Sequence, residues 1–212
     1  MHFCNMKEEV QNLIDTATLI MSESKDMLHD KGHISRMITD WNILSTKINK
    51  KIDCDVVVLA ICWHDTWLAT HNYEGIIGAL FEYIYEGVGS MLMFNKIAKR
   101  ECLDEKTRKD VAYAIKNHPG LPTSKHKTIE AKILWDVDNL ETWSWERLVG
   151  MYEENKSNKQ MIAMAKTYFE IVMKKRTSDR LYFDWSKSEF DKRKKVFLEK
   201  IRQYEKDGVV RL

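Results

Sequence analysis

Proline is almost absent from this chain of 212 residues, and its distribution constrains the fold more than any other feature. The two prolines, Pro119 and Pro122, fall together in the segment NHPGLP, and long stretches of helix-forming residues lie on either side of it. Because proline and glycine interrupt helices, a chain with one such segment can stay helical over most of its length. The sequence therefore predicts an all-α fold.

Apolar residues recur at intervals of three and four along most of the chain, which is the spacing of amphipathic helices. This pattern predicts nine or ten helices, over residues 7–22, 25–50, 54–69, 73–86, 90–101, 104–117, 124–141, 145–154, 157–176 and 186–206. In the last of them a narrow apolar stripe among charged residues predicts a surface helix; the stripe consists of Phe190, Phe197, Ile201 and Tyr204. We expect one domain, with a core over about 25–141 and a C-terminal helical extension over about 142–212.

The charge balance does not indicate a nucleic-acid partner, and the hydropathy excludes a membrane span. The 34 basic and 32 acidic residues are spread through the chain, so the net charge of +2 does not imply nucleic acid. The longest uncharged apolar run, VVVLAICW, is far shorter than the roughly 20 residues of a membrane-spanning helix. The four cysteines lack C-x-x-C spacing and the first ten residues lack a signal-peptide core, which predicts a reduced, cytoplasmic protein.

That apolar run ends in His64 and Asp65, two polar groups that need hydrogen-bond partners when buried. A parallel strand with both residues at its carboxyl end is one interpretation. No second β-branched run is present to pair with such a strand, and the apolar pattern continues to Ala69, beyond the usual strand length. A helix over 54–69 is therefore favoured.

A metal ion would satisfy both groups. Neighbours on a helix point about 100° apart, so the two side chains can converge on one ion over the flank between them, and other helices must complete its shell. Suitable residue types occur in LHDKGHISR, in ILWDVDNL and in AIKNHPG, which contain His29 and His33, Asp136 and Asp138, and His118.

Together these segments resemble the HD-domain metal-dependent phosphohydrolases of the small bacterial type, whose pattern is His, then His-Asp, then Asp on separate helices of an all-α domain. The resemblance covers about 29–141. The opening H-D-x-x-H-x-x-R matches at His29, Asp30, His33 and Arg36. The closing E-A-K-I-L-x-D-A-D-x-L matches over 130–140 with Val137 in place of Ala, and Asn139 stands where Arg is usual.

The resemblance implies one divalent cation, held by His33, His64, Asp65 and Asp138, and leaves room for a second. Mixed imidazole and carboxylate ligands suit Mn, Fe, Co, Ni, Zn or Mg. Asp136 and Asp138 lie about 200° apart on a helix and cannot both face the ion. Because Asp136 can pair with Lys132 on the helix surface, Asp138 is favoured as the ligand. His29 would support the site from behind it or be exposed.

The implied activity is hydrolysis of a phosphate ester, on a nucleotide or similar small metabolite, by water whose pKa the cation lowers. The catalytic candidates are Asp65, Arg36, His118 and Lys132, and the substrate-binding candidates are Arg36, Glu74 and His118. Each has a plainer interpretation as well. Arg36 can pair with Asp40 on the surface, His118 can stabilise a helix carboxyl end, and Glu74 can be a helix N-terminal acid. We expect Trp135, Trp143 and Trp145 to be core residues.

Two other functions stay open. A dinuclear iron oxygenase can be built on a related scaffold, but it needs ligands for a second metal, and the sequence offers only His118 for that purpose. A metal-stapled regulatory or interaction module would retain the motif without turnover. The sequence does not indicate the substrate, a monoester or a diester, the metal or the oligomeric state.

Overall fold

The computed structural model describes residues 7–24, 30–71, 75–120, 125–155, 157–158, 162–163, 167 and 169–206. These residues form α-helices and two short 3-10 helices, and no strand occurs among them, which confirms the predicted all-α fold. The chain divides into two compact units, Met1–Val137 and Asp138–Leu212. None of the helices in the described residues is both long and apolar enough to cross a membrane. The expectation of one domain stays a prediction.

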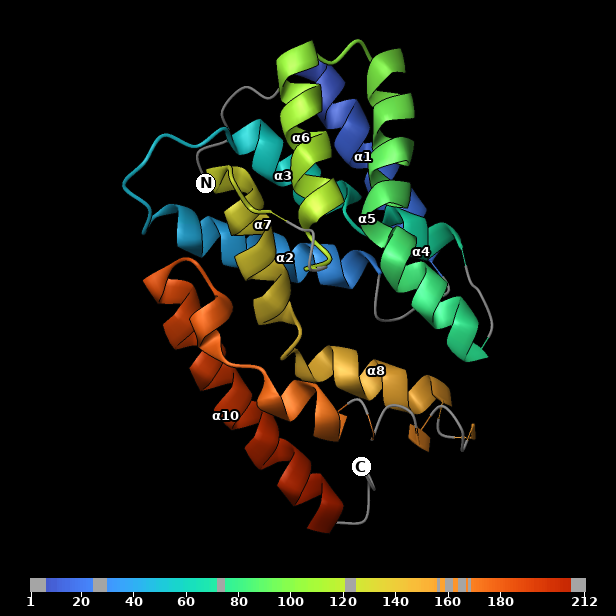
Figure 1. Ribbon diagram of the computed structural model, residues 1–212, viewed down its shortest axis with the longest axis vertical. Helices are drawn as coiled ribbons and strands as arrows, with labels where there is room; N and C mark the ends of the chain where they lie inside the picture. The colour runs from blue at the N-terminus through green and yellow to red at the C-terminus, as the bar shows by residue number, and fades with distance from the viewer. Residues whose placement is uncertain are drawn as a thin grey trace. The chain divides into compact units, whose positions relative to one another are not determined.

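The first unit is built around α3 (Cys54–Trp63), in which Val56, Val57 and all residues from Leu59 to Trp63 are buried. Around it lie α1 (Glu8–Ser22), α2 (Lys31–Ser45), α4 (Thr66–Thr70), α5 (Gly75–Arg100), α6 (Glu105–Asn117) and most of α7 (Ile129–Glu141). The helices α5 and α6 run side by side, and α6 also packs on α3 (Figure 1). Trp63 connects α3 with α1 and α5. Its indole N–H donates to the Leu13 carbonyl oxygen over 3.1 Å, and its ring meets the Phe94 ring edge-on.

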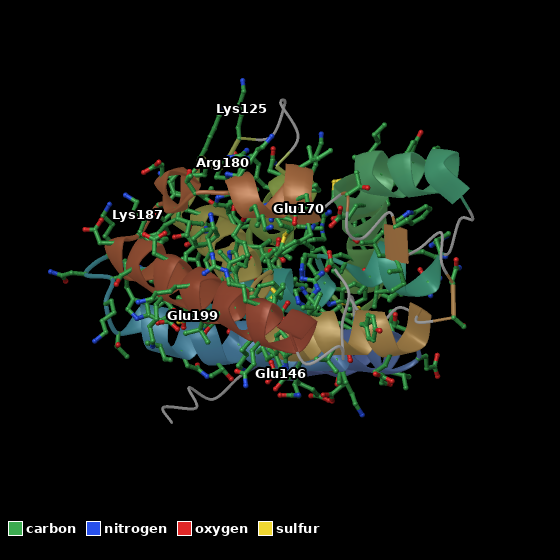
Figure 2. The ribbon with its side chains drawn as sticks, turned by 90° about the horizontal axis from the view of Figure 1, so that it is seen from below. Lys125, Glu146, Glu170, Arg180, Lys187 and Glu199 are labelled. Carbon is green, nitrogen blue, oxygen red and sulfur yellow. The ribbon has the colours of Figure 1, made fainter. Side chains whose placement is uncertain are left out.

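The second unit contains the end of α7, α8 (Trp145–Asn155), the 3-10 helices η1 (Met173–Lys175) and η2 (Ser178–Arg180), and α10 (Asp184–Lys206). Phe190, Phe197 and Ile201 on α10 are buried, as the apolar stripe predicts, and the rings of Phe190 and Phe197 meet Trp143 edge-on. The other faces of α10 carry charged side chains; Lys187 and Glu199 are marked in Figure 2. The predicted helix over 157–176 lies partly outside the described residues.

One predicted interruption is absent. The sequence predicts two helices over 73–86 and 90–101, separated at the glycines of EGVGS, but α5 runs through this segment without a break. The glycines serve close packing instead. A Cβ atom on Gly87 would lie 2.7 Å from the Lys116 carbonyl oxygen, and one on Gly89 would overlap the Trp67 ring. Ser90, the next residue, is buried and accepts a hydrogen bond from the Trp67 backbone N–H over 3.0 Å.

Two predicted helices also have different bounds. The predicted helix over 54–69 is broken at His64 and Asp65, which form a turn between α3 and α4. The predicted helix over 25–50 is shorter, because α2 begins only after Asp30. The Asp30 side chain accepts a hydrogen bond from the His33 backbone N–H, which is the geometry of a helix N-cap. Both differences affect the site.

Candidate metal centre

His33 is placed by the first turn of α2. The N-cap hydrogen bond from its backbone N–H to Asp30 Oδ1 is 2.9 Å long and fixes the start of the helix. Its imidazole is fully buried and points towards α3. The sequence H-D-x-x-H therefore supplies both a cap and an imidazole at a defined position.

His64 and Asp65 converge because the helix breaks there. Asp65 has φ −108° and ψ 10°, outside the α-helical range, so its side chain is turned relative to that of His64. His64 Nε2 lies 3.1 Å from Asp65 Oδ2. On a continuous helix the two side chains would diverge by about 100°. The turn thus brings neighbouring residues onto one point.

A first group of side chains that could hold a metal ion consists of His33, His64 and Asp65. Each of these residues is at most 2% exposed. His33 Nε2 lies 3.1 Å from His64 Nε2 and 3.4 Å from Asp65 Oδ2. Around a cation with metal–nitrogen bonds of about 2.1 Å, neighbouring ligand atoms are about 3.0 Å apart in an octahedral shell and about 3.4 Å apart in a tetrahedral one. The three separations therefore fit the edges of one coordination shell.

The tautomers of two histidines favour the same interpretation. His64 Nδ1 lies 2.8 Å from the Ile61 carbonyl oxygen, and His118 Nδ1 lies 2.7 Å from the Ile115 carbonyl oxygen. A carbonyl oxygen only accepts, so each Nδ1 carries the hydrogen, and each neutral ring keeps its lone pair on Nε2. A metal-ligating histidine commonly donates its other ring N–H to a carbonyl oxygen in this way. In both cases Nε2 is the atom that faces the carboxylates.

A second group adjoins the first and consists of Asp65, Glu86 and His118. His118 Nε2 lies 3.3 Å from Asp65 Oδ1 and 2.9 Å from Glu86 Oε1. Burial alone lowers the pKa of His118, but the hydrogen bonds to Asp65 and Glu86 outweigh it, so that this pKa lies well above its usual value. The Asp65 carboxylate thus directs Oδ2 to the first group and Oδ1 to the second.

Sequence reasoning missed Glu86. Its signal is weak, because Glu86 is a single acid in a largely apolar segment with several glycines. It also stands at the predicted end of the helix over 73–86, where an acid has no special meaning. The close approach at Gly87 brings α5 against the last turn of α6, where His118 lies. Only this packing places the two side chains in contact.

The other candidates are distributed as follows. Asp138 is half-buried and is the first residue of the second unit; neither of the two groups contains it, so its role stays a prediction. Asp136 is fully buried, so the expected position on the helix surface is wrong. Lys132 is half-buried. The pKa of the nearby His126 lies below its usual value, mainly because this side chain is partly buried and also because of the positive charges of His118 and Lys132.

Arg36 lies on α2, three residues after His33, and is half-buried. A Cβ atom on Gly32 would lie 3.0 Å from Arg36 Nη1 and 3.1 Å from Asp30 Oδ1, so the guanidinium turns back towards the start of α2. Asp40 is buried, so a pair between it and Arg36 would not lie on the surface, where the sequence places it. His29 and Glu74 lie outside the described residues. Trp135 and Trp143 are buried, as expected of core residues, and Trp145 is half-buried.

Comparisons with known proteins support the fold and are silent on activity. No family model and no curated protein matches the chain. Among solved structures, the chain is similar to the crystal structure of the Lin1889 protein from Listeria innocua, with a TM-score of 0.60 and 16% sequence identity. The match covers 98% of this chain and 100% of that one. At this identity the likeness shows a shared fold alone.

Proposed function

We propose that the protein is a metal-dependent hydrolase of small phosphate esters, such as nucleotides. The observation that carries this proposal is the first group, in which two imidazole nitrogens and a carboxylate oxygen face one another at the spacing of a coordination shell. Mixed nitrogen and oxygen ligands suit several divalent cations. The order of the ligands along the chain also resembles the HD-domain pattern, with Asp138 as the expected fourth ligand.

A divalent cation bound there would lower the pKa of water towards neutrality and offset the charge of the phosphoryl group. The residues of the chain would do the rest. The Asp65 carboxylate would hold the cation. Hydrolysis would replace the bond from phosphorus to the leaving oxygen by a bond to the water oxygen, and a proton of the water would pass to the leaving oxygen. Arg36, one turn after His33, orients two phosphate oxygens through its planar guanidinium. Lys132 adds positive charge where the phosphoryl group gains negative charge.

The test is metal reconstitution followed by a substrate screen. Protein freed of metal with a chelator is loaded separately with Mn, Fe, Co, Ni, Zn or Mg, and each form is assayed against nucleotides, phosphomonoesters and phosphodiesters. We expect turnover with at least one metal, and its loss in His33→Gln and His64→Gln. Asp110→Asn, which changes a surface acid paired with Lys106, is the control and should keep full activity.

Two results would contradict the proposal. Bound metal without turnover of any phosphate ester would favour a regulatory module. Oxygen consumption by the iron form, again without phosphate release, would favour an oxygenase. Measurement of metal content, phosphate release and oxygen uptake on the same preparation separates these outcomes.

The fourth ligand needs a matched pair of variants. Asp136→Asn and Asp138→Asn change one acid each, two positions apart on α7. If Asp138 is the ligand, its variant binds metal at least about 10-fold more weakly, while Asp136→Asn mainly loses stability, because its fully buried side chain loses charge. The reverse result would make Asp136 the ligand.

A further inference from the structure

Residues 171–182 of the second unit, IVMKKRTSDRLY, present basic and apolar side chains together. They include η1 and η2, and only Met173 and Leu181 among them are buried. Arg180 of this segment is marked in Figure 2. The large apolar side chains that the segment exposes are Ile171 at 56%, Tyr182 at 42% and Val172 at 38%. A single exposed apolar side chain is ordinary, but several beside a run of basic residues indicate a binding surface.

The segment is held firmly on α10. Lys194 Nζ donates to the carbonyl oxygen of Lys174 over 2.9 Å and to that of Arg176 over 2.6 Å. Residues 191–195 of α10, DKRKK, therefore lie against the segment and add four basic residues to the four that it contains. We call residues 171–182 and 191–195 together the basic patch. Because it is anchored in this way, its side chains are displayed on a defined backbone.

The basic patch has an excess of positive charge even after its ion pairs are counted. It contains eight basic residues and two acids, Asp179 and Asp191. Two acids next to it form ion pairs with it; these pairs are Lys174 with Glu170, and Lys192 and Arg193 with Glu189. Eight basic residues then stand against four acids, whereas the net charge of the whole chain is only +2. The basic patch therefore suits an anionic partner.

The exposed apolar side chains decide which anionic partner fits. Nucleic acids and anionic membranes both attract lysine and arginine. Proteins that bind single-stranded nucleic acid also supply rings on which bases stack, but Tyr182 is the only exposed aromatic residue of the basic patch. Ile171 and Val172 are aliphatic and suit the boundary between headgroups and acyl chains, and tyrosine is favoured at the same level. The combination fits a lipid surface better than a nucleic acid.

We infer that the basic patch binds the surface of a membrane that contains anionic lipids. Ile171 and Val172 enter between the lipids, and the lysine and arginine side chains lie against the negatively charged headgroups. The contact uses exposed side chains of the second unit, and no residue of the first group takes part. The inference therefore does not rest on the proposed function.

Vesicle flotation with the full chain tests the inference. Vesicles of phosphatidylcholine with phosphatidylserine should bind the protein, and vesicles of phosphatidylcholine alone should not. Lys175→Glu combined with Lys195→Glu reverses two exposed charges of the basic patch and should weaken the binding at least about 10-fold. Lys50→Glu combined with Lys51→Glu makes the same change of charge at exposed positions of the first unit and should bind normally.

A second variant tests the apolar contribution. Ile171→Ser combined with Val172→Ser keeps every charge, so weaker binding of this variant to the anionic vesicles shows that aliphatic side chains enter the lipid. Both side chains are exposed, and an unchanged melting temperature should confirm that the variant is folded.

Three results would overturn the inference. The first is the absence of binding of the unmodified protein to the anionic vesicles. The second is equal binding of the two lysine variants, which would show a response to net charge alone. The third is normal vesicle binding by the serine variant together with displacement of the protein from vesicles by single-stranded RNA, which would make the basic patch a nucleic-acid surface.

Discussion

The two units treat buried polar groups in opposite ways. In the second unit, Glu141 is fully buried, and Arg147 lies 3.0 Å from its carboxylate, so the chain itself supplies the compensating charge. In the first unit, buried imidazole nitrogens and carboxylate oxygens are gathered so that atoms with lone pairs face one another. Such an arrangement is unfavourable without a proton or cation between the atoms. The buried charge in the second unit is thus neutralised within the chain, whereas the buried groups of the first unit lower stability unless a proton or a cation binds between them.

Their apolar cores differ as well. The first unit buries mainly aliphatic residues of α3, and the second buries an aromatic cluster around Trp143 and Phe197. We therefore expect substitutions in the first group to change metal binding and turnover, and those in the second unit, apart from the expected ligand Asp138 and the basic patch, to change stability alone.

The largest expected effect is that of Asp65→Ala. The carboxylate contributes Oδ2 to the first group, so its removal should abolish metal binding there and reduce turnover below detection. Metal content measured by mass spectrometry checks this, with Asp110→Asn as the control. Retention of one full equivalent of metal in Asp65→Ala would show that Asp65 is not a ligand.

Phe197→Ala should produce the opposite pattern. Phe197 is 3% exposed and contacts Trp143, Trp145 and Phe169, so the cavity should lower the free energy of unfolding by about 3 to 5 kcal/mol. Metal content and turnover of the folded protein should not change. Denaturant unfolding and a metal assay on the same sample test both statements, and loss of metal would break the division between the units.

If the proposed function is right, Arg36→Ala should keep the metal and lose turnover by about 10- to 1000-fold, because the guanidinium would bind phosphate without ligating the cation. Arg36→Lys should recover only part of this loss, since an ammonium lacks the planar fork. If the guanidinium merely stabilises the start of α2 beside Asp30, the melting temperature falls and turnover per folded molecule stays constant. Steady-state kinetics with metal analysis distinguishes the two results.

The smallest effect concerns the thiols. Burial raises the pKa of Cys62 to about 12, whereas Cys54 and Cys102 are exposed. Since the thiolate is the reactive form, an alkylating reagent at pH 8 should modify Cys62 at least about 1000-fold more slowly than an exposed cysteine with a pKa near 8.5. Mass spectrometry of timed samples measures the rates. Rapid modification of Cys62 would show that the core around α3 opens easily.

The fold class and three candidate metal ligands can be predicted from the sequence alone. Helix formation depends on residues a few positions apart, so the scarcity of proline and the apolar spacing suffice to predict an all-α chain. His33, His64 and Asp65 were identifiable because their motif is compact and polar within apolar surroundings. The structure brings these three side chains together.

The way in which those three side chains converge, and the residues that lie next to them, depend on the tertiary structure and cannot be predicted from the sequence. The break at His64 and Asp65, the burial of Asp136 and the contact of Glu86 with His118 all depend on helices that are distant in the sequence. The glycines of α5 illustrate the reason. A glycine suits both a helix end and a close helix contact, and its sequence neighbours do not distinguish the two. At Gly87 the structure shows a close helix contact, because the Lys116 carbonyl oxygen packs where a Cβ atom would otherwise lie.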